Sequence, residues 1–250
     1  MLAPVSDSCS GKAICVAYGF YFFWNAFLNT LKSAALAAFT LLSFNSLAAS
    51  VSVNVFAIPS QNIENTVADV SAELNNEGMK TFYEKGFPVH VTLYLTQFDE
   101  SAVPSILEKV EALTATQTTI PLTANGFTVT AGNWVFVDAE VSHELQRLAD
   151  TVTLALEPMR DNKAPLPGWV NAYPVKKAAF ERYGSPNVFQ NFEPHMTLLA
   201  AEQSEALKAV AEKMKLKPPY TKGSVTAIGV GLADDKGQVS KILKVYPLKP

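Results

Sequence analysis

The chain of 250 residues is long enough for one large domain or two small ones, and 48% of its residues are hydrophobic while only 17% are charged. This composition supports a folded core and excludes a disordered, collagen-like or disulfide-rich protein. The formal net charge of −3 argues against a protein that coats nucleic acid by bulk electrostatics, because neutralising phosphates requires clustered lysine and arginine.

The first 48 residues are predicted to be a secretory signal peptide. Lys32 precedes a short apolar run over residues 33–42, and Ser46 and Ala48 supply the small residues of a cleavage site. A membrane anchor is the less favoured interpretation, because the run is shorter than the roughly 20 residues of a spanning helix. We therefore expect cleavage after Ala48 and a periplasmic or secreted protein that has no membrane attachment afterwards.

The segment before the apolar run is too long and too aromatic for an ordinary signal peptide. Two interpretations stay open: translation that truly starts near Leu28, or a second membrane-inserting segment from Ala13 to Leu28. Both cysteines, Cys9 and Cys15, precede the predicted cleavage site. The exported chain is therefore expected to have neither disulfides nor a thiolate site.

Residues 49–250 are predicted to form one domain of two lobes, built from strands and helices. In chain order, the apolar spacing predicts a strand, a helix, a strand, a helix and two strands, at residues 52–58, 63–74, 90–98, 103–113, 120–130 and 134–141.

The second half begins with a helix whose predicted N-cap is Ser142 and whose apolar stripe extends to Met159. A proline- and glycine-rich loop then leads to an apolar stretch at residues 170–175. A strand, a helix and a closing hairpin follow, at residues 195–200, 207–214, 225–232 and 239–245. Mixed helices and hairpins predict an α+β fold with antiparallel-rich sheets.

Two of the three histidines lie in the same local sequence. Residues 87–93 and 192–198 each have phenylalanine three positions before the histidine, threonine two positions after it and leucine next, so the chain contains a weak internal repeat. Residues two apart on a strand point to one face, about 6.5 Å apart. We therefore expect His90-x-Thr92 and His195-x-Thr197, on strands placed side by side, to line one groove.

This constellation has a specific chemical use. An imidazole pair can serve as general base and general acid near neutral pH, and hydroxyl groups can hold the non-bridging oxygens of a phosphate. His90 and His195 are therefore the candidate catalytic residues, and Thr92 and Thr197 the candidate phosphate ligands. His143 has no such partner and is expected on the solvated surface at a helix start.

The pair of motifs resembles the signature of the 2H phosphoesterase superfamily, which includes bacterial RNA 2′,3′-cyclic phosphodiesterases of the 2′-5′ RNA ligase type. The resemblance covers essentially all of residues 49–250. It implies a bilobal, pseudo-twofold fold whose two antiparallel-rich sheets line a water-filled central cleft, and metal-independent hydrolysis of a cyclic phosphate or related phosphodiester. One histidine would activate water and the other would protonate the leaving ribose oxygen; which does which stays open.

The chain departs from many RNA-processing members at one place. Those members carry an arginine shortly after the second motif, whereas residues 198–201 are apolar here, which disfavours a long RNA substrate. Tyr173, Tyr183 and Phe189 are candidates for stacking on a base, with ordinary core or loop packing as the alternative. No cofactor or metal is expected, because cysteine ligands and a helical histidine pair are both missing from the predicted exported chain.

The favoured function is an exported phosphodiesterase that acts on small cyclic phosphates such as nucleoside 2′,3′-cyclic phosphates. We expect a monomer whose partners are a small phosphodiester or nucleotide, RNA ends included, with no stable nucleic-acid complex. A non-catalytic module that binds a phosphorylated ligand and an RNA-end ligase or 2′-5′ phosphodiesterase are the alternatives.

Overall fold

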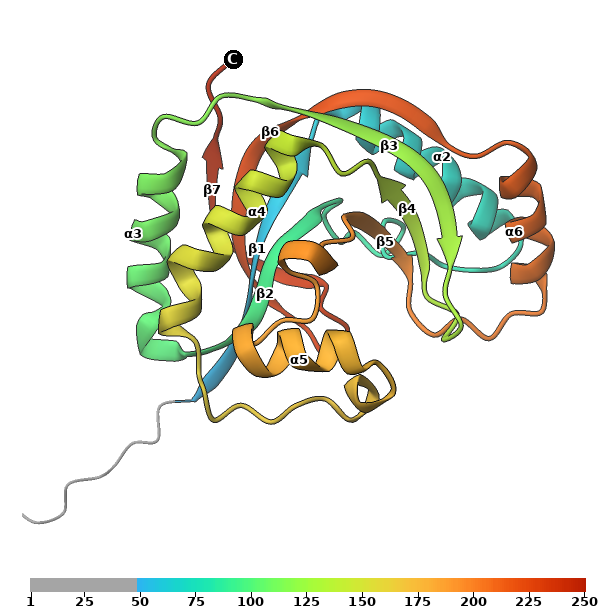
Figure 1. Ribbon diagram of the computed structural model, residues 1–250. Coiled ribbons are helices and arrows are strands. Elements are labelled where there is room, and N and C mark those ends of the chain that lie inside the picture. Colours follow the sequence, from blue (N-terminus) through green and yellow to red (C-terminus); the bar gives the residue numbers. More distant parts are fainter. Residues whose placement is uncertain (1–48) are drawn as a thin grey trace, which may run out of the picture. The chain divides into compact units, whose positions relative to one another are not determined.

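Helices pack against a curved antiparallel sheet in residues 49–250, the part of the chain that the computed structural model describes (Figure 1). The predicted signal peptide lies outside the described residues. The strands are β1 (Ser50–Pro59), β2 (Val91–Asp99), β3 (Ile120–Val129), β4 (Val135–Ala139), β5 (His195–Leu199), β6 (Tyr220–Ala233) and β7 (Val239–Pro247). The α-helices are α2 (Gln61–Asn76), α3 (Val103–Thr114), α4 (His143–Leu156), α5 (Pro174–Tyr183) and α6 (Ala206–Leu216). Short 3-10 helices in the connections are η1 (Glu100–Ala102), η2 (Glu157–Met159), η3 (Gly168–Ala172) and η4 (Phe189–Asn191).

Strand β6 joins the two halves of the sheet. The strand order is β2-β1-β6-β3-β4-β5, and β7 also pairs with β6. The first part of β6 pairs with β3 up to Val225, and the part from Val225 onward pairs with β1 and β7. We call β1, β2, β7 and the second part of β6 the first lobe, and β3, β4, β5 and the first part of β6 the second lobe. The predicted α+β fold is confirmed, and the two expected sheets are halves of one continuous sheet.

Two of the helices, α2 and α4, each follow a strand of one lobe and pack against the other lobe. α2 follows β1 of the first lobe but packs, with α6, against strands of the second, whereas α4 follows β4 of the second lobe and packs on β2 of the first beside α3. Figure 1 shows the two helix pairs on opposite sides of the molecule. The predicted stripes are buried, including Ile63 and Leu74 of α2 and Leu145 of α4. The predicted cap is confirmed, because Ser142 Oγ accepts a 3.1 Å hydrogen bond from the Leu145 amide.

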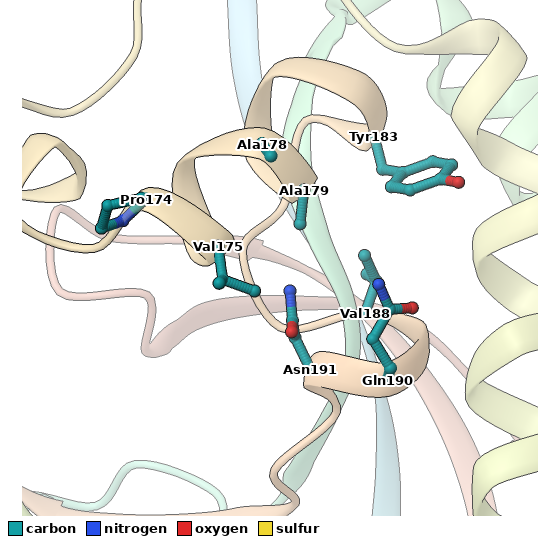
Figure 2. A pocket seen from close by; sticks show the side chains of 8 residues that line it. All are labelled: Pro174, Val175, Ala178, Ala179, Tyr183, Val188, Gln190 and Asn191. Atoms are coloured by element: carbon teal, nitrogen blue, oxygen red, sulfur yellow. The ribbon is translucent and has the colours of Figure 1, made fainter.

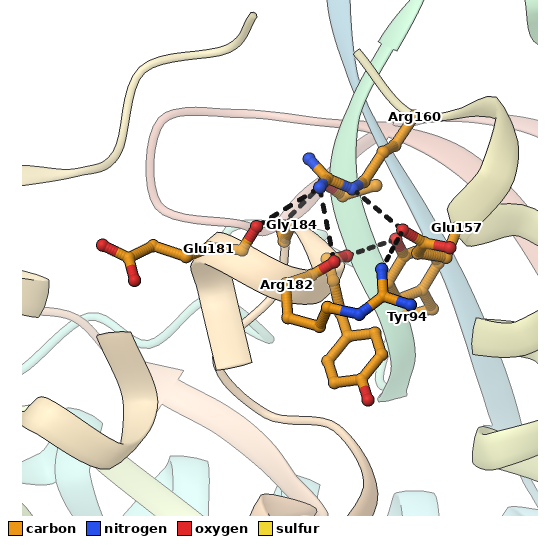
Figure 3. Close-up of polar contacts among 8 residues, drawn as sticks. Tyr94, Glu157, Arg160, Glu181, Arg182 and Gly184 are labelled. Atoms are coloured by element: carbon orange, nitrogen blue, oxygen red, sulfur yellow. Dashed lines mark hydrogen bonds and ion pairs between the residues drawn. The ribbon is translucent and has the colours of Figure 1, made fainter. Parts of the chain in front are cut away.

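The stretch at residues 170–175 is helical, since it falls in η3 and the start of α5. The sequence pattern did not predict α5 because only one of its side chains, Ala179, is buried. Polar contacts attach this helix instead: Tyr94 Oη donates to the Tyr183 carbonyl at 2.6 Å, and Arg160 donates to two further carbonyls at the helix end (Figure 3). Arg160 and Arg182 both pair with Glu157 at 3.4 Å.

None of the helices within residues 49–250 is long and apolar enough to cross a membrane.

Candidate active site

The two histidine motifs occupy matching positions in the two lobes. β1 and β2 pair so that Phe56 lies opposite Thr92, and β4 and β5 pair so that Phe136 lies opposite Thr197. In both pairs the register then shifts, and the leucine that follows each threonine has no opposite residue. A matched β-bulge in each lobe shows that the sequence repeat is a structural repeat as well. His90 itself lies one residue before β2, whereas His195 is the first residue of β5.

Both imidazole rings are oriented by the same kind of backbone contact. Nδ1 of His90 lies 2.9 Å from the carbonyl oxygen of Pro88, and Nδ1 of His195 lies 2.7 Å from that of Glu193. A carbonyl oxygen only accepts hydrogen bonds, so Nδ1 carries the proton in each ring. In the neutral form of either histidine, Nε2 is therefore the unprotonated, basic nitrogen.

A phenylalanine from the neighbouring strand packs against each ring. Phe56 meets His90 edge to face with ring centroids 5.3 Å apart, and Phe136 stacks on His195 at 4.0 Å with planes 28° apart. His90 is only 6% exposed, and His195 is half-buried. These apolar neighbours restrict the rotation of the rings and remove water from one side of each.

The fold brings the two motifs together. β2 and β5 are at opposite ends of the strand order, yet the curved sheet brings them into contact, and β5 lies next to β2 in Figure 1. His90 and Thr197, one from each motif, line the same small hollow of about 10 Å³. That volume matches the space one water molecule needs. His195 and Thr92 are not among the residues that line this hollow, so a groove lined by all four motif residues stays a prediction.

Asn54 on β1 is a buried site residue that sequence reasoning missed. Its Nδ2 donates to Thr92 Oγ1 at 3.0 Å and to the Gly237 carbonyl at 3.4 Å, and lies 3.5 Å from His90 Nε2. Its Oδ1 is buried without a hydrogen-bond partner among the described residues. A fully buried asparagine within an apolar strand is uncommon, and that was the available signal.

Asp138 on β4 is a second missed residue. It lies directly opposite His195 in the β4–β5 pair, half-buried, and accepts a 2.8 Å hydrogen bond from Thr128 Oγ1. Gly126, at φ +123°, leaves room for the carboxylate, because a Cβ there would lie 2.9 Å from Oδ2. Burial raises the pKa of the Asp138 carboxyl, while the Thr128 hydrogen bond and the positive charge of His195 oppose the shift.

Burial lowers the pKa of both motif histidines. For His90, the hydrogen bond to the Pro88 carbonyl opposes this shift, and the charge of His195 adds to it. For His195, the Glu193 carbonyl and the carboxylates of Asp138 and Glu193 raise the pKa, whereas the Lys176 ammonium lowers it. Each pKa stays below the ordinary value for histidine, so both rings are mainly neutral at about pH 7.

The three aromatic candidates for base stacking lie on α5 and η4 or directly beside them. Tyr173 is 50% exposed and meets Trp169 edge to face. Tyr183 and Phe189 pack against each other with centroids 4.7 Å apart, and the Arg182 guanidinium lies over the Tyr183 ring at 5.1 Å. These contacts occupy much of the Tyr183 ring, and base stacking by the three residues stays a prediction.

A cavity of about 490 Å³ lies between α5 and η4 (Figure 2). Tyr183, Val175 and Asn191 are among its lining residues. The wall of this cavity is tied to the second motif, because Lys176 of α5 forms a 2.8 Å ion pair with Glu193.

His143 is exposed at the start of α4, away from the two motifs. In the part of the chain that the structure describes, no group of three or more histidine, cysteine, aspartate or glutamate residues is placed to hold a metal ion.

The sequence model of the 2′-5′ RNA ligase superfamily matches residues 59–237. The chain matches no curated protein. Among solved structures, the protein TT0787 of Thermus thermophilus is similar, with a TM-score of 0.54 and 15% identity over 79% of this chain and 98% of that one. A structure described as a phosphoesterase has a TM-score of 0.49 and 14% identity, covering 81% of this chain and all of its own. Apo LigT of E. coli has a TM-score of 0.49 and 13% identity, covering 80% and 99%. The likeness to TT0787 supports the same fold.

Proposed function

The chain belongs to the 2′-5′ RNA ligase superfamily of 2H phosphoesterases, and from that premise we propose that it is a metal-independent phosphodiesterase that hydrolyses nucleoside 2′,3′-cyclic phosphates or closely related small phosphodiesters. The superfamily supports a phosphodiesterase or RNA-processing activity. The observation that carries the finer proposal is the matched pair of histidines, each of which holds its Nδ1 proton against a backbone carbonyl and keeps Nε2 for proton transfer.

Hydrolysis needs two proton transfers, and the two Nε2 atoms supply them. One neutral imidazole accepts a proton from water as the water oxygen bonds to phosphorus. The other imidazole is protonated at Nε2 and donates its own Nε2 proton to the leaving ribose oxygen as the bond between that oxygen and phosphorus breaks. The product is a nucleoside monophosphate with one free ribose hydroxyl. An imidazole pair with lowered pKa values suits this reaction near and somewhat below neutral pH.

We expect the two threonines to hold the phosphate. Asn54 donates its hydrogen bond to Thr92 Oγ1, so the hydroxyl hydrogen of Thr92 stays free to donate to a non-bridging oxygen. Thr197 is half-buried on the side of β5 that also carries His195, opposite the buried Met196. Hydroxyl donors at fixed positions stabilise the charge that develops on the phosphate, and no cation is required for that task.

A substrate panel tests the proposal. The purified protein should hydrolyse 2′,3′-cyclic nucleotides, and the rate should be unchanged by EDTA. 2′-5′-linked dinucleotides and RNA ends in the same panel distinguish the alternatives, with the His195→Ala variant as the inactive control. Loss of activity on chelation, with rescue by Mn²⁺ or Zn²⁺, would contradict the two-histidine mechanism. Phosphate binding without turnover would favour a binding module, and joining of RNA ends would favour a ligase.

A further inference from the structure

The cavity between α5 and η4 is a feature of its own, apart from the two histidine motifs. Its volume of about 490 Å³ is within the usual range of small-molecule sites. None of the described residues that line it belongs to a motif or also lines the hollow that contains His90 and Thr197. The same lining residues include no charged side chain, so they offer no cation to a phosphate group. A ligand that fits this cavity is therefore uncharged where it is enclosed.

The two walls of the cavity differ in chemistry. Val175, Ala178 and Ala179 of α5 form an apolar wall, and the two small alanines leave space that larger side chains would fill. On the opposite side, Gln190 and Asn191 of η4 direct their amide groups toward α5, as Figure 2 shows. A ligand that matches both walls has an apolar face and a polar edge.

The amide of Asn191 lacks a hydrogen bond on this side. Its Nδ2 is buried and has no hydrogen-bond partner among the described residues. A buried donor without an acceptor is costly, and most buried polar groups in folded proteins have a partner. An acceptor atom on a ligand in the cavity would be that partner. The amide of the exposed Gln190 can both donate and accept at the same edge of the ligand.

We propose that the cavity between α5 and η4 binds an uncharged heteroaromatic ring with a hydrogen-bond acceptor at its edge. The flat apolar face of the ring packs on Val175, Ala178 and Ala179, and the acceptor takes the hydrogen bond of Asn191 Nδ2. Two sources have this chemistry. One is the base of a nucleoside phosphodiester, and the other is a separate small molecule such as nicotinamide.

Binding in this cavity acts on the second motif. The side chain of Asn187 holds the backbone of Glu193, because it donates to the Glu193 carbonyl at 3.2 Å and accepts from the Glu193 amide at 3.1 Å. The Glu193 carboxylate pairs with Lys176 of α5 at 2.8 Å, and the Glu193 carbonyl lies 2.7 Å from His195 Nδ1. A ligand that moves α5 or η4 therefore changes the position of the His195 ring. This consequence rests on the proposed phosphodiesterase function, whereas the binding itself does not.

Titration of the purified protein with adenosine, uridine and nicotinamide tests binding without turnover. At least one of these probes should shift the side-chain amide signals of Asn191 in NMR spectra and reach saturation. Ala178→Leu fills the cavity and should weaken that binding by about tenfold or more. Asn191→Leu keeps the size of the side chain but removes the donor, and should weaken binding by about two- to tenfold. Ala209→Leu is the matched control, because it makes the same change at an exposed position of α6 and should leave binding unchanged.

Kinetics on a 2′,3′-cyclic nucleotide distinguish the two sources of the ring. If the probe competes with the substrate and Ala178→Leu raises KM with kcat unchanged, the ring is the base of the substrate. If the probe changes kcat without competing, the ligand is a separate molecule. A probe that binds and alters neither quantity would refute the coupling to the second motif.

Binding by none of the three probes, or binding that Ala178→Leu leaves unchanged, would overturn the proposal. The NMR titration does not depend on catalysis. If a probe binds as expected and no phosphodiester is hydrolysed, the proposed function fails while the assignment of the cavity stands.

Discussion

His90 and His195 each lie beside a backbone carbonyl and a phenylalanine, although Phe56 meets His90 edge to face and Phe136 stacks on His195. His143 is exposed at the start of a helix. A single histidine on a half-buried strand is most often structural. Two histidines in repeated motifs, on strands that the curved sheet brings into contact, support the proposed pair of a proton donor and a proton acceptor.

In the proposed reaction the two histidines act as one unit, so their replacements should show strongly non-additive effects. Replacing either by alanine should lower kcat on a 2′,3′-cyclic nucleotide by about 10²–10⁴-fold. The double variant should be little slower than the poorer single variant. His143→Ala is the matched control and should keep the full rate. A double variant whose loss equals the product of the two single losses would show that the histidines act separately.

The repeat that contains the two histidines and the two threonines could be recognised in the sequence because each motif is local and occurs twice. Asn54 and Asp138 could not be found this way, because they belong to other strands. Their approach to the histidines depends on strand register and on the matched bulges, which only the folded sheet defines. Residues of this kind are visible in a sequence only as polar interruptions of an apolar pattern.

At the scale of single elements, strand β6 affects the position of His90 through the phenylalanine that packs against its ring. Gly229 of β6 lies opposite Phe56 of β1, and a Cβ at this glycine would collide with the phenylalanine ring. The ring therefore uses the space over the glycine, and its edge-to-face contact with His90 depends on that space. A change in β6 should therefore affect the His90 ring through one intermediate side chain, Phe56.

Gly229→Ala should accordingly damage both stability and activity. The forced shift of the ring should cost about 1–3 kcal/mol of unfolding free energy, the usual range for overpacking. It should also lower kcat under conditions where the protein stays folded. Ser142→Ala is the control, because it removes the cap of α4 at a cost of about 1 kcal/mol and leaves the site intact. Urea unfolding and kcat should be measured on both variants. An unchanged kcat in Gly229→Ala would contradict the expected effect of β6 on the His90 ring.

Most strands and helices could be predicted from apolar spacing, since their buried faces follow periods of about two or 3.6 residues. α5 could not, because its attachment rests on Tyr94 and Arg160, which lie far from it in sequence and contact its terminal carbonyls. The pattern also identified the buried stripes of α2 and α4 without showing that each helix covers the opposite lobe. An apolar stripe in the sequence shows that one face of a helix is buried, but it does not show which part of the sheet covers that face.

At the scale of the whole molecule, β6 and the exchanged helices make the two lobes dependent on each other. β6 pairs with strands of both lobes, and α2 and α4 each leave one lobe to cover the other. The contact between β2 and β5, which brings the motifs together, closes the curve of the same sheet. The relative placement of the histidines is therefore fixed by the complete sheet.

We propose export on the basis of the apolar run after Lys32 and the small residues at Ser46 and Ala48. Cleavage after Ala48 would leave the first strand complete, because the Ala49 carbonyl accepts a hydrogen bond from the Glu100 amide and Ser50 is the first residue paired with β2. Cleavage a few residues later would remove part of β1. Fractionation of the native host, with mass spectrometry of the N-terminus, should therefore find a species that begins at Ala49 outside the cytoplasm. Full-length protein confined to the membrane pellet would instead identify the segment as an anchor.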